Sequence, residues 1–167
     1  MIYDYDISDF KDDCYAFNTV AGKDTLCTLK DIEFQYNLIL EETKEIKDKG
    51  IDKNNAKEVV DGVVDVLVTA LGLAQKLENL GVDMNKAMRD TAYNNLTKYP
   101  SDERIAIETA QKYEQEGKQV QVEYKSDYDL FVIKDLKDKV MKPVGFESND
   151  LSNCIPADLL QNGFKED

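Results

Sequence analysis

The chain has 167 residues, enough for one domain with a core that needs no disulfides. Its 34 acidic and 21 basic side chains give a formal net charge of −13, which disfavours nucleic acid or an anionic membrane surface as a partner. The sequence contains no histidine, which excludes serine–histidine and cysteine–histidine catalysis in their usual form. A metal site would then use oxygen ligands, which favour Mg²⁺, Mn²⁺ or Ca²⁺.

The cysteines and the hydropathy indicate a cytoplasmic protein. The chain has three cysteines, Cys14, Cys27 and Cys154. They form no CxxC pair, and an odd number leaves at least one unpaired, so we expect reduced thiols. No apolar run reaches the roughly 18 residues of a membrane span, and the opening MIYDYDISDF is not typical of a signal peptide. We therefore expect no membrane partner.

Start and stop signals divide the first two thirds of the chain into five helices. Ser8 is a candidate N-cap for the first helix, Gly50 and Gly81 end the second and third, and Tyr99–Pro100 breaks the fourth. The expected helices cover residues 8–19, 28–49, 55–79, 83–96 and 101–116.

The sequence changes character after residue 100. Three segments, QVQVEY, YDLFVIK and KVMKPVGF, are enriched in β-branched and aromatic residues and are separated by the turn-like KSD and DLKDK. We expect a mainly α fold, an antiparallel helical bundle with a small C-terminal antiparallel β appendage. Residues 1–100 would form the helical core, and residues 101–167 would add a helix and three short strands to the same domain.

The stretch from residue 58 to residue 74 is the most informative part of the chain. Glu58, Asp61 and Asp65 are its only charges, and helical geometry places them within about 60° of one another. The rest is so apolar that we expect a buried helix. A carboxylate on a buried helix is costly unless it is paired, neutralised or bound to a metal.

A second acidic face precedes this helix. It is formed by Glu41, Glu42 and Glu45 in the expected helix over residues 28–49, where Glu42 and Glu45 lie on the flank of the apolar stripe. Two acidic faces could hold Mg²⁺, or Mn²⁺, between them. The alternative for the glutamates is a solvated helix face.

The alternative for the two aspartates is a set of buried ion pairs. Asp61 and Asp65 would then be bonded to Lys44, Lys98 or Arg89.

Glycines inside the apolar helix predict close packing. Gly62 and Gly72 each cost about 1 kcal/mol in a helix, so another helix or subunit is expected to approach there. The apolar face is larger than a few helices can cover. We expect a homodimer or a dimer of dimers, with the site near an interface.

The end of the fourth expected helix offers ligand-binding groups. Asn95 and Lys98 are one turn apart and Tyr99 follows. A lysine there could hold a phosphate oxygen, and the asparagine could bind a ligand or water. The alternative is a lysine that only complements the helix dipole.

Three motifs in this order resemble one family. EETKE at residues 41–45, EVVD at 58–61 with Asp65 a turn later, and NLTK at 95–98 are similar to the pattern of the all-α nucleotide pyrophosphohydrolase superfamily. That superfamily includes MazG, the phosphoribosyl-ATP pyrophosphohydrolases and the dimeric all-α dUTPases. The first helix and the tail resemble phage members, so the cytoplasm would be that of a host.

The resemblance implies hydrolysis of a nucleoside triphosphate, or a related nucleotide, to the monophosphate and pyrophosphate. It implies Mg²⁺ bound by a subset of the acids, and a water oriented or deprotonated by Glu41 or Glu42. The implied metal ligands are Glu42, Glu45, Glu58, Asp61 and Asp65, and the implied substrate-binding residues are Asn95, Lys98, Tyr99 and Gln35. Two registers of the second motif are open, Glu58/Asp61 and Asp61/Asp65, and both use Asp61.

Two other classes compete with this interpretation. A ferritin-like di-iron protein needs Glu-x-x-His pairs, and the chain has no histidine. A non-enzymatic acidic interaction protein, such as a viral inhibitor of a host factor, would explain the charge and the strands. It would leave buried Asp61 and Asp65 without a reason.

Overall fold

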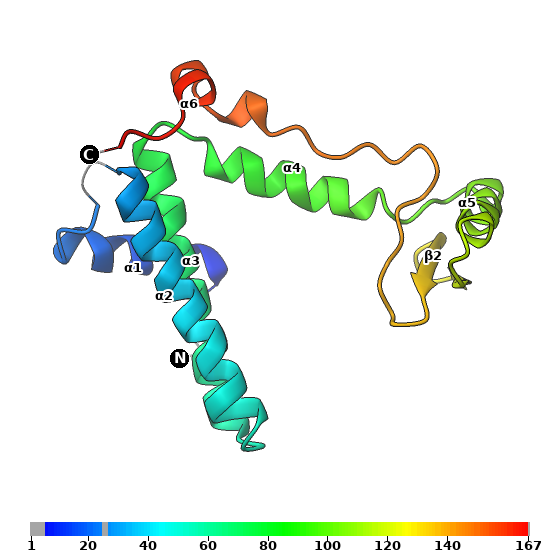
Figure 1. The fold of residues 1–167 in the computed structure, drawn as a ribbon, viewed down its shortest axis with the longest axis horizontal. Helices are drawn as coiled ribbons and strands as arrows, with labels where there is room; N and C mark the ends of the chain where they lie inside the picture. The colour runs from blue at the N-terminus through cyan, green and yellow to red at the C-terminus, as the bar shows by residue number, and fades with distance from the viewer. Residues whose placement is uncertain (1–5, 25–26, 167) are drawn as a thin grey trace. The chain divides into compact units, whose positions relative to one another are not determined.

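The computed structural model describes residues 6–24 and 27–166. It is mainly helical, as expected, with one small antiparallel sheet in the described part of the chain (Figure 1). The helices are α1 (Ile7–Val20), α2 (Leu29–Glu45), α3 (Ala56–Asn79), α4 (Met84–Leu96), α5 (Glu103–Gln115) and α6 (Ala157–Asn162). A π-helical turn η1 (Ile46–Ile51), a 3₁₀ turn η2 (Ser152–Cys154) and the strands β1 (Val120–Lys125) and β2 (Leu130–Asp135) complete the described elements. None of the described helices is long and apolar enough to cross a membrane.

The chain forms two compact units. The first contains residues 1–84 and 152–167, with α1, α2, α3 and α6, and the second contains residues 85–151, with nearly all of α4, α5 and the sheet. The division differs from the expected boundary at residue 100, because the segment after β2 is bonded to α4. The Asn94 amide donates to the carbonyl oxygen of Glu147 at 2.9 Å, and Asn149 donates to the Thr91 hydroxyl at 3.2 Å.

Side-chain caps explain where the first three helices begin. Asp6, rather than the expected Ser8, caps α1, because its carboxylate accepts the amides of Ser8 and Asp9 in a capping box. Thr28 caps α2 with a second capping box, and Asn55 caps α3.

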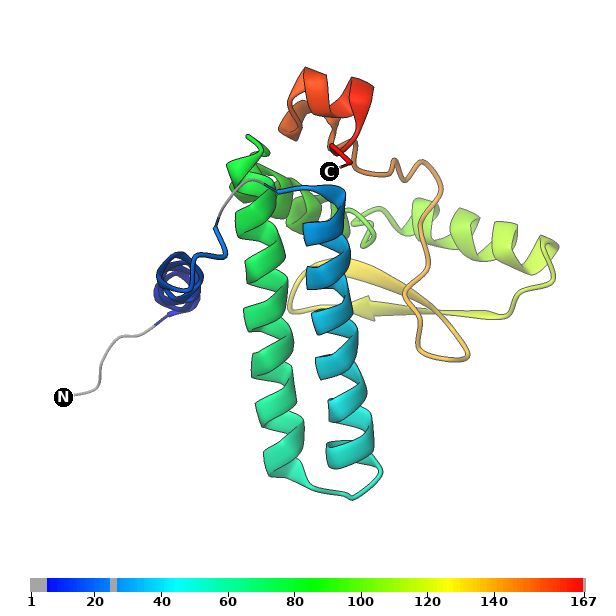
Figure 2. The same cartoon turned by 60° about the vertical axis from the view of Figure 1, so that its left-hand side comes forward.

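The helices α2 and α3 form the antiparallel pair at the centre of the first unit. They lie side by side and run in opposite directions (Figure 2). The expected close approach at the helical glycines is found within the chain, since a Cβ at Gly62 would lie 2.6 Å from Ile46 Cγ1 and one at Gly72 would lie 2.8 Å from Gln35 Nε2. The Gln35 amide nitrogen donates to the Thr69 carbonyl oxygen at 2.7 Å, which ties the two helices together.

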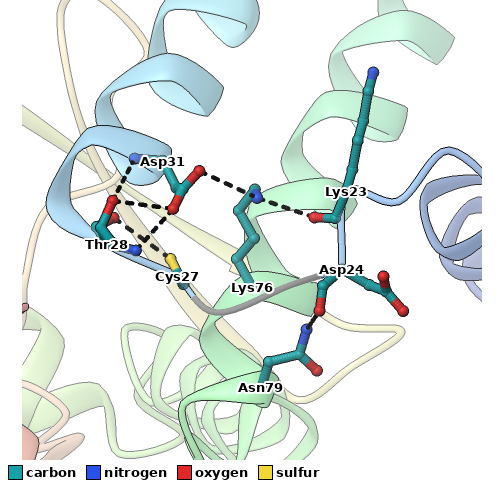
Figure 3. A network of polar contacts seen from close by, with 7 residues as sticks. All are labelled: Lys23, Asp24, Cys27, Thr28, Asp31, Lys76 and Asn79. Carbon is teal, nitrogen blue, oxygen red and sulfur yellow. Dashed lines mark hydrogen bonds and ion pairs between the residues drawn. The ribbon is translucent and has the colours of Figure 1, made fainter. Parts of the chain in front are cut away.

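A buried lysine joins α3 to the segment that precedes α2 (Figure 3). Lys76 is 7% exposed, and its Nζ donates to the Lys23 carbonyl oxygen at 3.0 Å and lies 4.0 Å from Asp31 Oδ1. One turn further along α3, the Asn79 amide donates to the Asp24 carbonyl oxygen at 2.7 Å. The bond to Lys23 and the nearby Asp31 carboxylate offset the cost of burying the Lys76 ammonium.

The prediction of a third strand is wrong. The strands β1 and β2 pair in antiparallel register from Val120 opposite Asp135 onward, but the next segment makes only one isolated bridge, between Lys134 and Val140. Pro143 has no amide hydrogen to donate, and the Val144 amide donates instead to the Thr109 hydroxyl on α5 at 2.9 Å. The segment therefore leaves the sheet and crosses to α5.

The three cysteines, Cys14, Cys27 and Cys154, are free thiols and are all buried. Burial raises the pKa of the Cys14 and Cys27 thiols, which keeps both in the protonated, weakly reactive form.

Candidate functional site

The two acidic motifs come together where α2 packs on α3. Glu42 on α2 is half-buried, and its burial raises the pKa of its carboxyl above the usual range. The negative charge of Asp65 on α3 raises this pKa further, as do Glu45 and Glu41 on its own helix. The acids of the two predicted motifs therefore repel one another across the helix pair.

One lysine sits among these acids. Lys49 Nζ pairs with Glu45 Oε2 at 2.5 Å, one helical turn away. This hydrogen bond raises the pKa of Lys49, although partial desolvation opposes it, and the charges of Glu45, Glu58 and Glu42 raise it further. Lys49 was not predicted as part of the site, although its position four residues after Glu45 is a detectable i, i+4 pair.

The prediction that α3 is buried is wrong for the single chain. Asp61 and Asp65 are exposed, and so are Val60 and Leu67, at 64% and 42%. The reason is that α2 covers only one side of α3. Advancing 100° per residue places Val60, Val63, Val64 and Leu67 on the opposite side. Asp61 and Asp65 lie on the flank between these two sides.

Across the residues that the structure describes, the alternative ion pairs of Asp61 and Asp65 are not formed either. Lys44 lies 3.9 Å from Asp48, and Arg89 lies 3.5 Å from Asp90. Lys98 donates to the Asn95 side-chain oxygen.

The donor chemistry of this face suits a hard divalent cation, but a single chain does not close a site around one. Carboxylate oxygens whose charges repel one another are the ligands that Mg²⁺ and Mn²⁺ favour. Among residues 6–24 and 27–166, no three acidic or cysteine side chains are grouped closely enough to hold a metal ion. The Lys49 ammonium already offsets part of the negative charge that a metal cation would otherwise neutralise.

The remaining predicted residues fall in two places. In the second unit, Lys98 Nζ donates to Asn95 Oδ1 at 2.7 Å, and Tyr99 lines a cavity. In the first unit, Gln35 is only 7% exposed and is bonded to Thr69. This bond gives Gln35 a role in helix pairing, and its contact with substrate stays a prediction.

Comparisons of the chain with protein-family models, with curated proteins and with solved structures find no match.

Proposed function

We propose that the chain is a Mg²⁺-dependent hydrolase that converts a nucleoside triphosphate, or a related nucleotide, to the monophosphate and pyrophosphate. The observation that supports this most is the effect of Asp65 on Glu42, because it joins the two acidic motifs across the helix pair. Carboxylates whose charges repel one another destabilise the fold unless a cation offsets them. They are useful where a bound cation is part of the function.

Each acid has a role in this proposal. Asp65, Asp61, Glu58 and Glu45 are the residues that would hold Mg²⁺, which when bound offsets phosphate charge and lowers the pKa of a bound water. Glu42 orients or deprotonates the attacking water, and its raised pKa makes it a stronger base than an ordinary glutamate. The exposed Glu41 is the second candidate for that role.

We also propose that a second copy of this chain covers the exposed side of α3. The site favours this occupant, because the acids of one chain, within residues 6–24 and 27–166, do not close around a cation. The apolar stripe of Val60, Val63, Val64 and Leu67 borders Asp61, while Asp65 lies further round α3, toward α2. Packing one stripe against its symmetry mate would bring Asp61 of each chain toward the other chain.

The test is pyrophosphate release in Mg²⁺ from a panel that includes dUTP, dCTP, a purine triphosphate and an alarmone. Asp65→Asn and Asp61→Asn keep the side-chain volume and remove the charge that a hard cation needs. Both should abolish release without unfolding the protein. Glu33→Gln on the exposed side of α2 is the matched control and should retain activity. Full activity in Asp65→Asn would refute the proposal.

An acidic interaction protein is the second candidate, and the exposed apolar stripe of α3 favours it. In that case no nucleotide of the panel would be hydrolysed. Mg²⁺ would also leave the melting temperature unchanged, because no site would bind it.

A further inference from the structure

Two lysines converge on one aromatic ring in the second unit. Lys98 Nζ lies 6.0 Å and Lys142 Nζ 5.1 Å from the centroid of the Phe146 ring, within range of a cation–π contact. Within the part of the chain that the structure describes, neither lysine forms an ion pair with a carboxylate. Lys98 donates to Asn95, and Lys142 lies 3.5 Å from the Ser148 hydroxyl. The two lysines therefore place two ammonium groups beside one ring in a chain with a net charge of −13.

The backbone around this ring is held at both ends. On one side the Tyr113 hydroxyl of α5 donates to the Lys142 carbonyl oxygen at 3.0 Å. On the other side Asn94 of α4 donates to the Glu147 carbonyl oxygen. Between them, the Phe146 amide closes a turn by donating to the Pro143 carbonyl oxygen at 3.0 Å. The ring and Lys142 therefore sit on a backbone segment that is bonded to both α4 and α5.

Phe146 also lines a cavity of about 490 Å³ between the ends of α4 and α5. This volume lies within the roughly 300–1,000 Å³ typical of small-molecule sites. Its apolar lining comes from Phe146, Tyr99, Pro100 and Ile105, and its polar lining includes Asn94 and Ser101. Aromatic and proline surfaces suit a planar ring, and the amide and hydroxyl can make hydrogen bonds at its edge.

Two acids, Asp102 and Glu147, also line this cavity, and among the described residues no ion pair joins either of them to Lys98 or Lys142. Asp102 accepts a hydrogen bond from Arg104 Nη2 at 2.7 Å and also caps α5, so its charge is already paired. Glu147 is exposed, and its backbone carbonyl rather than its carboxylate is bound to Asn94.

We propose that this cavity binds a nucleotide, with the base inside it against Phe146 and Tyr99. The phosphate would lie outside the cavity lining, beside Lys98 and Lys142, which do not line the cavity but lie against the Phe146 ring. The inference rests on the proposed function for the class of ligand, a nucleotide, and adds Lys142 and Phe146 to the residues that bind it. Lysine is a flexible point charge, so two ammonium groups beside one ring can converge on a phosphate. The aromatic base of the nucleotide would pack against the apolar lining of the cavity.

Calorimetric titration of UMP and AMP into the full chain, in buffer with EDTA, tests the inference without hydrolysis or metal. We expect both to bind, and adenosine and inorganic phosphate alone to bind more weakly. Lys142→Ala should weaken binding at least tenfold, since a hydrogen bond to a charged group contributes about 1.5–3 kcal/mol. Lys142→Arg should restore most of it. Phe146→Leu should also weaken binding.

Lys112→Ala, an exposed lysine of α5, is the matched control and should leave binding unchanged. Absence of nucleotide binding in the wild-type chain, or equal affinities in Lys142→Ala and Lys112→Ala, would overturn the inference. The Asp65→Asn variant distinguishes failure of this inference from failure of the proposed function. That variant should lose pyrophosphate release and still bind UMP through Lys142. If no hydrolysis is found in the wild type, a Lys142-dependent affinity for UMP still supports the nucleotide site.

Discussion

Gln35 Nε2 donates to the carbonyl oxygen of Thr69 at 2.7 Å, and this hydrogen bond links α2 to α3. The site depends on this pairing, because the acids of the two helices face one another only while the helices stay in register.

Gln35→Ala should therefore lower the free energy of unfolding by about 1–3 kcal/mol, from the lost hydrogen bond and the space left behind. Chemical denaturation measures the change. Gln111→Ala, an exposed glutamine of α5, is the control and should change stability little. An equal effect of the two substitutions would show that the Gln35 bond is not what holds the helices.

Two glycines of the helix pair should respond differently to alanine. At Gly50 a new Cβ would lie 2.6 Å from Val59 Cγ2 and 3.0 Å from the Val59 backbone nitrogen, so Gly50→Ala should destabilise the fold by about 1–3 kcal/mol. At Gly62 the nearest atom is Ile46 Cγ1, a side-chain atom that can move, and alanine gains about 1 kcal/mol of helix propensity. Gly50→Ala should have a clearly lower melting temperature than Gly62→Ala. The reverse order would contradict this packing.

The raised pKa of Glu42 predicts a pH-dependent stability. Because the folded state holds the Glu42 proton more tightly than the unfolded chain, ionisation of this carboxyl destabilises the fold as the pH rises through the raised pKa. In metal-free buffer at pH 7, Glu42→Gln should melt above the wild type. The difference should disappear as the pH falls below the ordinary value of 4.5.

Melting curves of wild type, Glu42→Gln and Glu33→Gln between pH 4 and pH 8 check this. The Glu33 control should show no such trend. A wild type more stable than Glu42→Gln at pH 7 would mean that Glu42 is paired with a cation.

At the proposed metal site, Lys49 would compete with a bound cation for the acidic face. Lys49→Met removes the charge next to Glu45, Glu58 and Glu42, so in EDTA the variant should melt below the wild type. Mg²⁺ should then raise its melting temperature more than that of the wild type, because the emptied face binds the cation several-fold more tightly. Lys53→Met, an exposed lysine outside the pair, is the control. Identical Mg²⁺ responses of the two variants would argue against a metal on this face.

The exposed stripe of α3 predicts self-association. The wild type should have a solution mass of at least twice the 19.0 kDa of one chain, and Leu67→Asp should reduce it to that of the monomer. Light scattering coupled to size exclusion measures both. Ile107→Asp, on an exposed apolar residue of α5, should leave the mass unchanged. A monomeric wild type at micromolar concentration would refute the dimer.

The helices were readable from the sequence because their signals are local. The caps at Thr28 and Asn55, and the glycines at residues 50 and 81, place α2 and α3 close to the expected bounds. The helical spacing of Glu58, Asp61 and Asp65 depends only on 3.6 residues per turn. The prediction of a third strand failed because the Val144 amide donates to the Thr109 hydroxyl, which lies 35 residues away in the sequence.

The sequence by itself determined the helical class, the acidic motifs and the glycines that allow close packing, since each depends on residues within a few turns. Only the tertiary structure decided that Gln35 binds Thr69, that Lys49 sits among the acids and that α4 joins the second unit. It also decided that Asp61 and Asp65 are exposed in one chain. The physical reason is that burial and side-chain pairing depend on which surfaces meet across long sequence separations, and periodicity carries no information about the surface that lies opposite.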